Sequence, residues 1–468
     1  MTQEDMAQLS REELVEMVLA EYAQLEASQV IIAQLQADIE ALKLKLEKGK
    51  RPPTNSNNSS QPPSRDQKSN APKDRRKRHR HGPPVGHVKY ERKFVSEPDH
   101  VVEVRPQVCE TCQGDLSKES GSLADVNQIT ELPEAKAEVI EVRQYEVECP
   151  CCGKKQMAEP PGGLEMERTF GARLEATVVY YRQEQHMSYV RTESALRDLH
   201  AVKISPGGID KIMQRGGQQA AQQVDPIQAE IQQSAVVHCD ETGSRVDGQN
   251  WWQWVFCSAS AVFHVIRFDR SVDVIKDVMA GHEVDVWVSD CYSAQMKSPA
   301  RERQLCMAHQ LRNLQAVVDF YPASFWPRAM QTLFRSAIHL HNQRDHLSPP
   351  EFQTQVQRVE YLCDWLLERS LEQPEAKRLL KRYRKYRDYL FVFLHRTDVN
   401  PTNNASERYL RPAVVHRKII GCFRSGWGAH AYAALASIIA TAALKGISSF
   451  DAIQNLFGTP SLPLPNGV

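Results

Sequence analysis

The chain has 468 residues, 41% of them hydrophobic, and its acidic and basic side chains balance to a net charge of zero. This length predicts roughly three domains. The start of the chain is acidic and lacks a signal-peptide core, and the longest apolar run, residues 431–444, is too short to span a bilayer. These features argue against a secreted or membrane protein, and we expect a cytoplasmic one.

Residues 1–48 predict a coiled coil. From Leu25 to Leu46 the apolar positions alternate in steps of three and four, with Ser28 filling one slot, and neither Pro nor Gly interrupts them. We expect this segment to make the protein a homo-oligomer. The alternative is a single helix that packs on its own domain.

Residues 49–86 are a linker rich in Pro, Asn, Ser and Gln, a composition that forms no core. Within it, residues 73–80 hold six bases and one acid. We predict that this basic run contacts the phosphates of DNA, and the alternative is a solubilising tail. The DNA-contact candidates are Arg75, Arg76, Lys77, Arg78 and Arg80.

Residues 87–160 contain five of the eleven cysteines, and the other six are scattered singly. This usage is typical of reduced thiols with one metal site, not of a disulfide framework. Two CxxC turns stand 36 residues apart and predict a structural zinc ion, with free thiols as the alternative. Partial alternation over residues 137–147 predicts ribbon strands between them. The predicted zinc ligands are Cys109, Cys112, Cys149 and Cys152, and Cys151 is a spare thiol.

Residues 161–232 read as helices. Leu196, Leu199 and Val202 have the spacing to pack one helix, and Ser205-Pro206 is typical of the start of another. The two helices fit a helix-turn-helix that binds DNA or a helical connector, and the sequence favours neither.

Residues 233–310 change to a strand pattern. We predict strands over residues 235–242, 251–258, 262–266 and 284–288, a helix over 272–279, and a short strand at 304–306. Antiparallel hairpins followed by a parallel crossover make the first and fourth strands neighbours in a mixed α/β sheet. Asp240 and Asp290, which follow those two strands, then emerge at the same edge.

Residues 311–400 predict a helical insertion, because the segment is too long for a loop. Residues 377–389 carry seven bases interleaved with Tyr383, Tyr386 and Tyr389. The bases fit a phosphate-binding helix with Lys381, Arg384 and Arg387 as DNA contacts, and a solvated face over a tyrosine core fits equally well. Before the insertion, Cys306 and His309 are two metal-ligand types; two ligands do not make a site, so we read them as structural.

Residues 401–450 predict the closing helices of the core, and 451–468 a C-terminal tail. Asn403-Asn404 is typical of a helix start, which places Glu407 in the first turns, and residues 428–444 predict a small-residue helix packed under the sheet. The bases that follow Glu407 are suited to hold DNA phosphates: Arg408, Arg411, Arg417 and Lys418.

Phosphodiester transfer needs an activated oxygen nucleophile and a stabilised leaving oxygen, and two Mg²⁺ ions supply both. Mg²⁺ prefers carboxylate oxygens. Asp240, Asp290 or Glu407 alone would more often be a solvated or salt-bridged residue. Because the two aspartates end strongly apolar runs and Glu407 opens a basic helix, we interpret the three as one cluster for two divalent cations.

The chain resembles transposases of the insertion sequence sixty-six family. The resemblance rests on the linker residues 58–66, the cysteine pairs, Asp240-Glu241-Thr242, Ser289-Asp290, Cys306-x-x-His309 with Arg312, and residues 403–429, most of all Asn403-Asn404-Ala405-Ser406-Glu407-Arg408. It departs from the family pattern at Thr402 and Cys291, where we expect Asp and Gly.

The resemblance implies an RNase H-like catalytic domain of the Asp-Asp-Glu type. In this sequence the triad is Asp240, Asp290 and Glu407, with Mg²⁺ or Mn²⁺ as cofactor. It also implies cleavage at element ends and transfer of a 3′ hydroxyl into double-stranded target DNA, in the bacterial cytoplasm at the nucleoid. Small accessory proteins of the same element are further candidate partners. The rival interpretations are an inactive DNA-binding relative and a nuclease that does not join strands.

Overall fold

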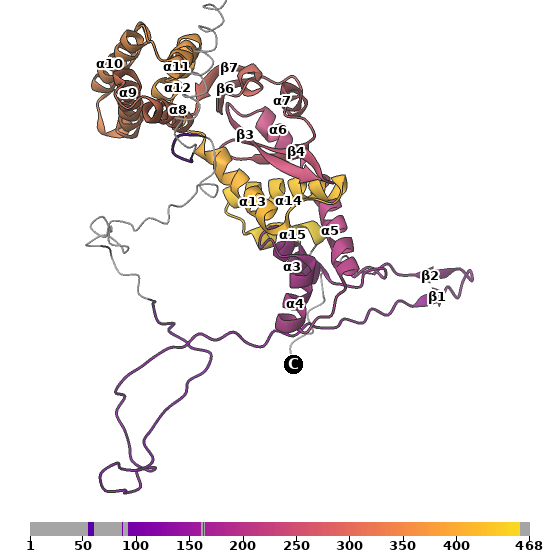
Figure 1. The fold of residues 1–468 in the computed structure, drawn as a ribbon. Coiled ribbons are helices and arrows are strands. Elements are labelled where there is room, and N and C mark those ends of the chain that lie inside the picture. Colours follow the sequence, from indigo (N-terminus) through magenta and orange to yellow (C-terminus); the bar gives the residue numbers. More distant parts are fainter. Residues whose placement is uncertain (1–54, 60–86, 88–91, 161, 163, 459–468) are drawn as a thin grey trace, which may run out of the picture.

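The computed structural model describes residues 55–59, 87, 92–160, 162 and 164–458. The predicted coiled coil and the basic run at residues 73–80 lie outside these residues. The described part contains a mixed sheet with helices on both faces, a separate helical lobe, and an extended cysteine-containing segment (Figure 1). This is a mixed α/β architecture, as the sequence predicts.

The central sheet has five strands in the order β5-β4-β3-β6-β7. Strands β3, β4 and β5 form an antiparallel meander, and β6 and β7 continue the sheet in parallel. Asp247 and Gly248 form the two-residue turn between β3 and β4, and both have positive φ, which Gly adopts freely and Asp tolerates. The strands are β3 Val236–Val246, β4 Gln249–Cys257, β5 Val262–Arg267, β6 Val284–Ser289 and β7 Ala300–Leu305.

Helices α6 (Asp225–Gln232) and α7 (Val272–Met279) cover one face of the sheet. Their apolar side chains pack on Trp254, Phe256 and Trp287, which point to this face from β4 and β6. The predicted helix at 272–279 has these bounds, but the fifth strand begins at Ala300, earlier than the predicted 304, and a 3₁₀ turn at Gln295–Lys297 precedes it.

Helices α13 (Asn404–Ile420) and α14 (Gly426–Leu444) cover the other face (Figure 1). Strand β5 is an edge, and two α14 hydroxyls satisfy it: Ser437 Oγ accepts from the His264 N–H at 2.8 Å, and Thr441 Oγ1 from the Val262 N–H at 3.0 Å. By length and apolarity alone, α14 would suffice to cross a membrane. These bonds and its buried face make it a core helix, packed as predicted.

A third group of helices packs against α14. It comprises α3 Ala172–Gln183, α4 Tyr189–His200, α5 Pro206–Ala221 and α15 Ser449–Phe457. The α5 helix approaches α14 closely, since a Cβ on Gly217 would lie 2.4 Å from the Ala431 Cβ. Two predictions need correction. Leu199 is exposed rather than packed, and residues 451–457, predicted as part of a tail, belong to the amphipathic helix α15, whose apolar face is buried.

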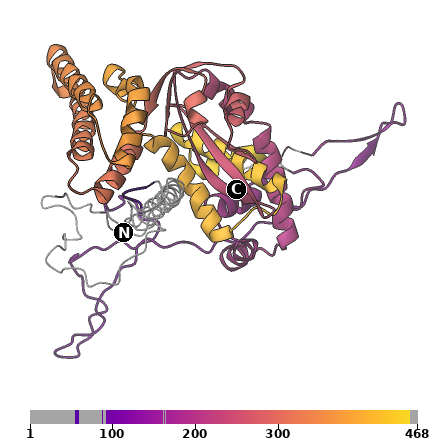
Figure 2. The same ribbon diagram turned by 45° about the horizontal axis from the view of Figure 1, so that its top comes forward.

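The insertion forms a lobe of its own beside the edge strand β7 (Figure 2). Its apolar core continues into the sheet through Val286, Val288 and Leu305. The lobe contains α8 Met307–Phe320, α9 Phe325–Asn342, α10 Pro349–Leu367, α11 Pro374–Lys385 and α12 Val392–His395. Residues 311–400, predicted as a helical insertion, are accordingly mostly helical.

Residues 92–160 contain little regular structure. A two-stranded hairpin, β1 (Glu146–Glu148) and β2 (Lys155–Met157), is their only named secondary structure element. Strands were predicted within residues 137–147. No strand forms over residues 137–145, and β1 begins only at Glu146.

Candidate active site

The pairing of β3 with β6 places Asp240 and Asp290 at equivalent positions. Val236, Val237 and His238 pair with Val286, Trp287 and Val288 of the parallel neighbour. Each aspartate follows the last of these pairs by two residues, and alternation directs both toward the face that α13 covers. The structure therefore brings the two predicted aspartates to one edge and one face.

Backbone contacts fix both side chains. Asp240 Oδ1 accepts from the Glu241 N–H at 2.9 Å, and Asp290 Oδ1 accepts from the Tyr292 N–H at 2.8 Å. Both residues are partly buried. Asp240 was predicted to follow its strand but lies within β3, opposite Val255 of β4, whereas Asp290 directly follows β6. Short side chains that are held by the backbone of a sheet lose little freedom when they bind a ligand, which favours a preorganised site.

Asn403 positions the third carboxylate. The α13 helix begins at Asn404, as predicted, and Glu407 lies in its first turn. The Asn403 side chain, however, does not cap the helix. It is fully buried, and its Nδ2 donates to the Cys239 carbonyl at 2.8 Å while Oδ1 lies 3.2 Å from His238 Nδ1. Asn403 thus ties the start of α13 to the strand that carries Asp240.

The three carboxylates interact electrostatically. Burial raises the pKa of the Asp240 carboxyl well above its ordinary range, and the charges of Glu241, Asp290 and Glu407 raise it further. Asp290 and Glu407 also both act on His309. The segments carrying Asp240, Asp290 and Glu407 therefore converge on one region of concentrated negative charge.

Glu241 is a fourth acid that the sequence did not single out. It points to the opposite face of β3 from Asp240, where Arg270 binds it at 2.7 Å and Gln295 Nε2 donates to it at 2.8 Å. The Arg270 guanidinium is held against the rings of Trp252 and Tyr292. Burial and Asp290 raise the pKa of Glu241, whereas Gln295 and Arg270 lower it. Its charge is compensated, unlike that of Asp240.

Helix α8 presents three side chains toward Glu407. Arg312 Nη2 donates to Glu407 Oε1 at 3.4 Å, and His309 Nδ1 lies 3.8 Å from the same oxygen. The Cys306 thiol, fully buried at the start of α8, belongs to the same group. Because Glu407 is about a hundred residues further along the chain, no local spacing in the sequence reveals this group.

The family model described as "Transposase IS66 family" matches residues 167–431, which is more than half of the chain and includes all three carboxylates. The chain belongs to the IS66 transposase family. A comparison with curated proteins finds no match. Membership makes the protein an enzyme of the transposase type that acts on DNA.

The bases of α13 are the best placed of the transposase's predicted DNA contacts. Arg408, Arg411 and Lys418 are exposed, and Arg417 is partly buried near Gly243 of β3. They follow Glu407 along the same helix. Their role in DNA binding stays a prediction.

In the helical lobe of the transposase, the tyrosines and the bases of residues 377–389 have different environments. Tyr383 is fully buried against Trp326 and Phe334, so the tyrosine stripe is core. Lys381 is exposed. Arg384 donates to the Leu367 and Arg369 carbonyls, and Arg387 pairs with Asp364, so both hold α11 and the turn after it against α10. The structure gives these two arginines a packing role, and DNA contact remains untested for all three bases.

The two cysteine turns of the transposase are each formed locally. The Gln113 N–H donates to the Cys109 carbonyl and the Gly153 N–H to the Cys149 carbonyl. Backbone N–H groups within each turn lower the pKa of the Cys109 and Cys149 thiols, which favours thiolates. The two turns point in different directions, and in the described part of the chain they do not gather around one ion (Figure 1). The single four-cysteine zinc site stays a prediction.

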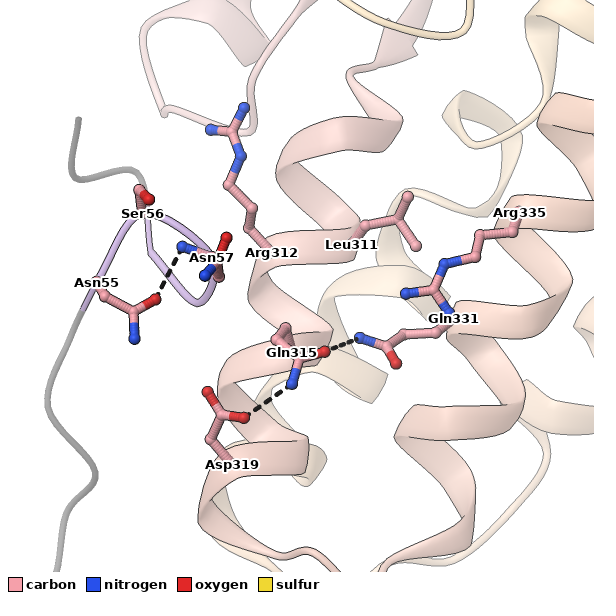
Figure 3. A pocket seen from close by; sticks show the side chains of 9 residues that line it. All are labelled: Asn55, Ser56, Asn57, Leu311, Arg312, Gln315, Asp319, Gln331 and Arg335. Atoms are coloured by element: carbon pink, nitrogen blue, oxygen red, sulfur yellow. Dashed lines mark hydrogen bonds between the residues drawn. The ribbon is translucent and has the colours of Figure 1, made fainter. Parts of the chain in front are cut away.

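A short N-terminal turn docks beside the carboxylates. Residues 55–59 lie against α8, where Asn58 is buried and its Nδ2 donates to Asp319 Oδ2 at 2.9 Å. Figure 3 shows the adjoining pocket of about 600 Å³, with Arg312 at one end, next to the turn. Its lining is mostly polar: Asn55, Ser56, Asn57, Leu311, Arg312, Gln315, Asp319, Gln331 and Arg335.

Proposed function

We propose that this transposase uses Asp240, Asp290 and Glu407 to cut DNA at the ends of its element and to join the 3′ hydroxyl to target DNA. The observation that supports the proposal is the convergence of the three carboxylates. They come from two adjacent parallel strands and from a helix more than a hundred residues later, and their charges act on one another.

The sheet supports an RNase H-like assignment for the core. Three antiparallel strands come first, and the strand after the α7 crossover returns to lie parallel to the first. Asp240, just beyond the residues of β3 that pair with β6, and Asp290, directly after β6, belong to one charge cluster with Glu407 of α13. Strand order, crossover and acid positions agree with one another, and together they favour this class over other mixed sheets.

The donor set fits divalent magnesium or manganese. Three carboxylates supply only oxygen ligands, which hard cations prefer. The mutual repulsion that raises the pKa of Asp240 is the kind of charge excess that bound cations offset. When bound, two such ions activate the attacking oxygen and stabilise the leaving oxygen.

The chain's own residues then perform separate tasks. Asp240, within β3, and Asp290, directly after β6, hold fixed ligand positions on the sheet, and Arg312 restrains Glu407 from the side of α8. Arg408 and Arg411, one and four residues after Glu407, are suited to bind phosphates of the cut strand. Residues upstream of the core, including the zinc module and the basic run, grip the element ends, and the coiled coil brings subunits together.

A strand-transfer assay tests this function. Purified full-length protein is mixed with Mg²⁺, a target plasmid, and duplexes that carry the inverted repeats flanking its gene. We expect cleavage and joining, and Asp290→Asn should reduce both by at least about 10²-fold, since a ligand of the reacting ions is lost.

Asp285→Asn is the matched control, because this aspartate lies on the same strand but pairs with Arg301 and Arg396 away from the site. It should leave activity unchanged. Full activity of Asp290→Asn would refute the assignment. Cleavage without joining would identify a nuclease, and binding without cleavage an inactive relative.

A further inference from the structure

Cys306, His309 and Glu407 form a compact group of potential metal ligands. One ligand atom from each lies within 4.8 Å of the other two. The thiol is fully buried and the other two side chains are partly buried. Two are borderline-soft nitrogen and sulfur donors, so this group differs chemically from the three carboxylates that share Glu407.

The imidazole of His309 is aimed at this group with an unused atom. Its Nδ1 is shielded from solvent and has no hydrogen-bond partner within the part of the chain that the structure describes. A buried polar atom without a partner carries a free-energy cost, and such atoms call for an explanation in a folded protein. A metal ion between Nδ1 and the Glu407 oxygen, 3.8 Å apart, supplies the missing partner.

The surroundings of Cys306 suit a thiolate. Its Sγ accepts from the Asn403 backbone N–H at 3.2 Å, and it stands at the N-terminus of α8, where the helix dipole favours negative charge. Coordination to a metal deprotonates a thiol outright.

The spacing fits a zinc ion. Ligands at about 2.0–2.3 Å from a tetrahedral ion lie about 3.3–3.6 Å from one another. The 3.8 Å between His309 Nδ1 and Glu407 Oε1 is close to that value. The ligand atoms of the three residues lie within 4.8 Å of one another, and small side-chain rotations would bring them to the spacing that zinc needs. Three protein ligands with a fourth open position is a common zinc arrangement.

We propose that Cys306, His309 and Glu407 bind a zinc ion, and that this ion withdraws Glu407 from the magnesium site. Mg²⁺ gains nothing from a thiolate, whereas Zn²⁺ does, so the two ions compete for the same glutamate. Zinc therefore inhibits the transposase at a site separate from the cysteine turns. The binding claim stands on its own, and the inhibition claim rests on the proposed function of Glu407.

Binding is measured on full-length protein freed of metal by a chelator. Co²⁺, a spectroscopic substitute for Zn²⁺, is titrated in, and the thiolate-to-cobalt absorption is followed together with the number of ions bound. We expect Cys306→Ser to bind one ion fewer per chain than the wild type. Cys363→Ser, which changes another fully buried cysteine, in α10, should bind the same number as the wild type.

Inhibition is measured by adding Zn²⁺ to Mg²⁺-supported strand transfer. Half-inhibition of Cys306→Ser should need at least about tenfold more Zn²⁺ than that of the wild type, because a ligand is lost. Should Cys306→Ser fold poorly by circular dichroism, His309→Asn carries both measurements with the thiol intact. Equal ion counts in wild type and variants would overturn the proposal, whether or not the protein transposes. A lower count with unchanged inhibition would overturn its regulatory part.

Discussion

The central sheet and the cysteine segment of residues 92–160 are organised by different means. In the sheet, Trp254 and Trp287 are completely buried. In the cysteine segment, Val104, Leu132 and Val139 are 89%, 86% and 96% exposed. Burial of apolar surface fixes the strands of the sheet and thereby the two aspartates. The cysteine segment has local turns but no core.

The difference leads us to predict that the cysteine segment, and not the sheet, depends on a ligand for its structure. The sheet orders its carboxylates through its own packing and through Asn403. The cysteine segment carries apolar side chains that its two short strands cannot cover, and its best-formed features are the two thiol-bearing turns. A small unit of this kind gains its folding free energy from a metal.

Zinc removal gives the largest expected effect, because a structural zinc ion contributes about 10–16 kcal/mol to the folding of such a module. We expect residues 92–160 to resist limited proteolysis with Zn²⁺ and to be cleaved after chelation, while the sheet stays intact. Cys149→Ser should abolish this protection. Cys151→Ser, which changes the spare thiol, should retain it; equal protection in both variants would contradict the four-cysteine site.

Asn403→Ala tests whether packing alone holds the site in the sheet. The change leaves the buried Cys239 carbonyl and His238 Nδ1 without the amide that joins them, and we expect the free energy of unfolding to fall by about 2–4 kcal/mol. Asn404→Ala, at the exposed neighbouring position, should cost no more than about 0.5 kcal/mol. Chemical denaturation measures both, and similar losses would remove Asn403 from its positioning role.

Asp240→Asn tests the negative charge that the packing of the sheet places at the candidate site. The pKa of Asp240 is raised in the folded state. Above about pH 4 the unfolded chain has therefore lost a proton that the native state keeps. The free energy of unfolding consequently falls as the pH rises toward the folded-state pKa. In the metal-free protein at neutral pH, Asp240→Asn should therefore raise Tm by at least about 2 °C.

The increase in Tm caused by Asp240→Asn should shrink toward pH 4 and disappear when Mg²⁺ stabilises the wild type. Asp285→Asn, which breaks ion pairs on the same strand, should not raise Tm at any pH. Scanning calorimetry over a pH series checks both variants. A wild type more stable than Asp240→Asn in the absence of metal would show that the carboxylates do not repel one another.

Asn58→Ala has the smallest expected effect and concerns the turn at residues 55–59, which packs on α8. Loss of its bond to Asp319 should weaken docking by about 1–2 kcal/mol without changing Tm. Hydrogen exchange at residues 55–59 measures the loss. Asn57→Ala, at an exposed position of the same turn, should leave the exchange unchanged.

The sequence predicted most of the sheet because its signals are local. Alternating apolar residues, the Asp247-Gly248 turn and the helix at 272–279 each follow from neighbouring residues, and together they place Asp240 beside Asp290. The α13 start was predicted in the same way from Asn403-Asn404. The family resemblance selected Glu407, which composition alone does not distinguish from other acids.

The missed features all depend on contacts between distant segments. Asn403 was expected to cap its helix, and it bonds to β3 instead. Glu241 appeared to be an ordinary neighbour of Asp240 until Arg270 and Gln295 were seen around it. Residues 451–457 read as a tail because their apolar face has no partner in the local sequence; α3 and α5 supply that partner.

The turn at residues 55–59 is fixed to helix α8 of the helical lobe. Asn58 is fastened to the same helix that carries Arg312 and His309 to Glu407. Lys73 follows Ser59 by 14 residues, and a chain of that length reaches at most about 50 Å. The covalent length of the linker therefore limits how far the first of these bases can be from α8, whatever conformation the linker adopts.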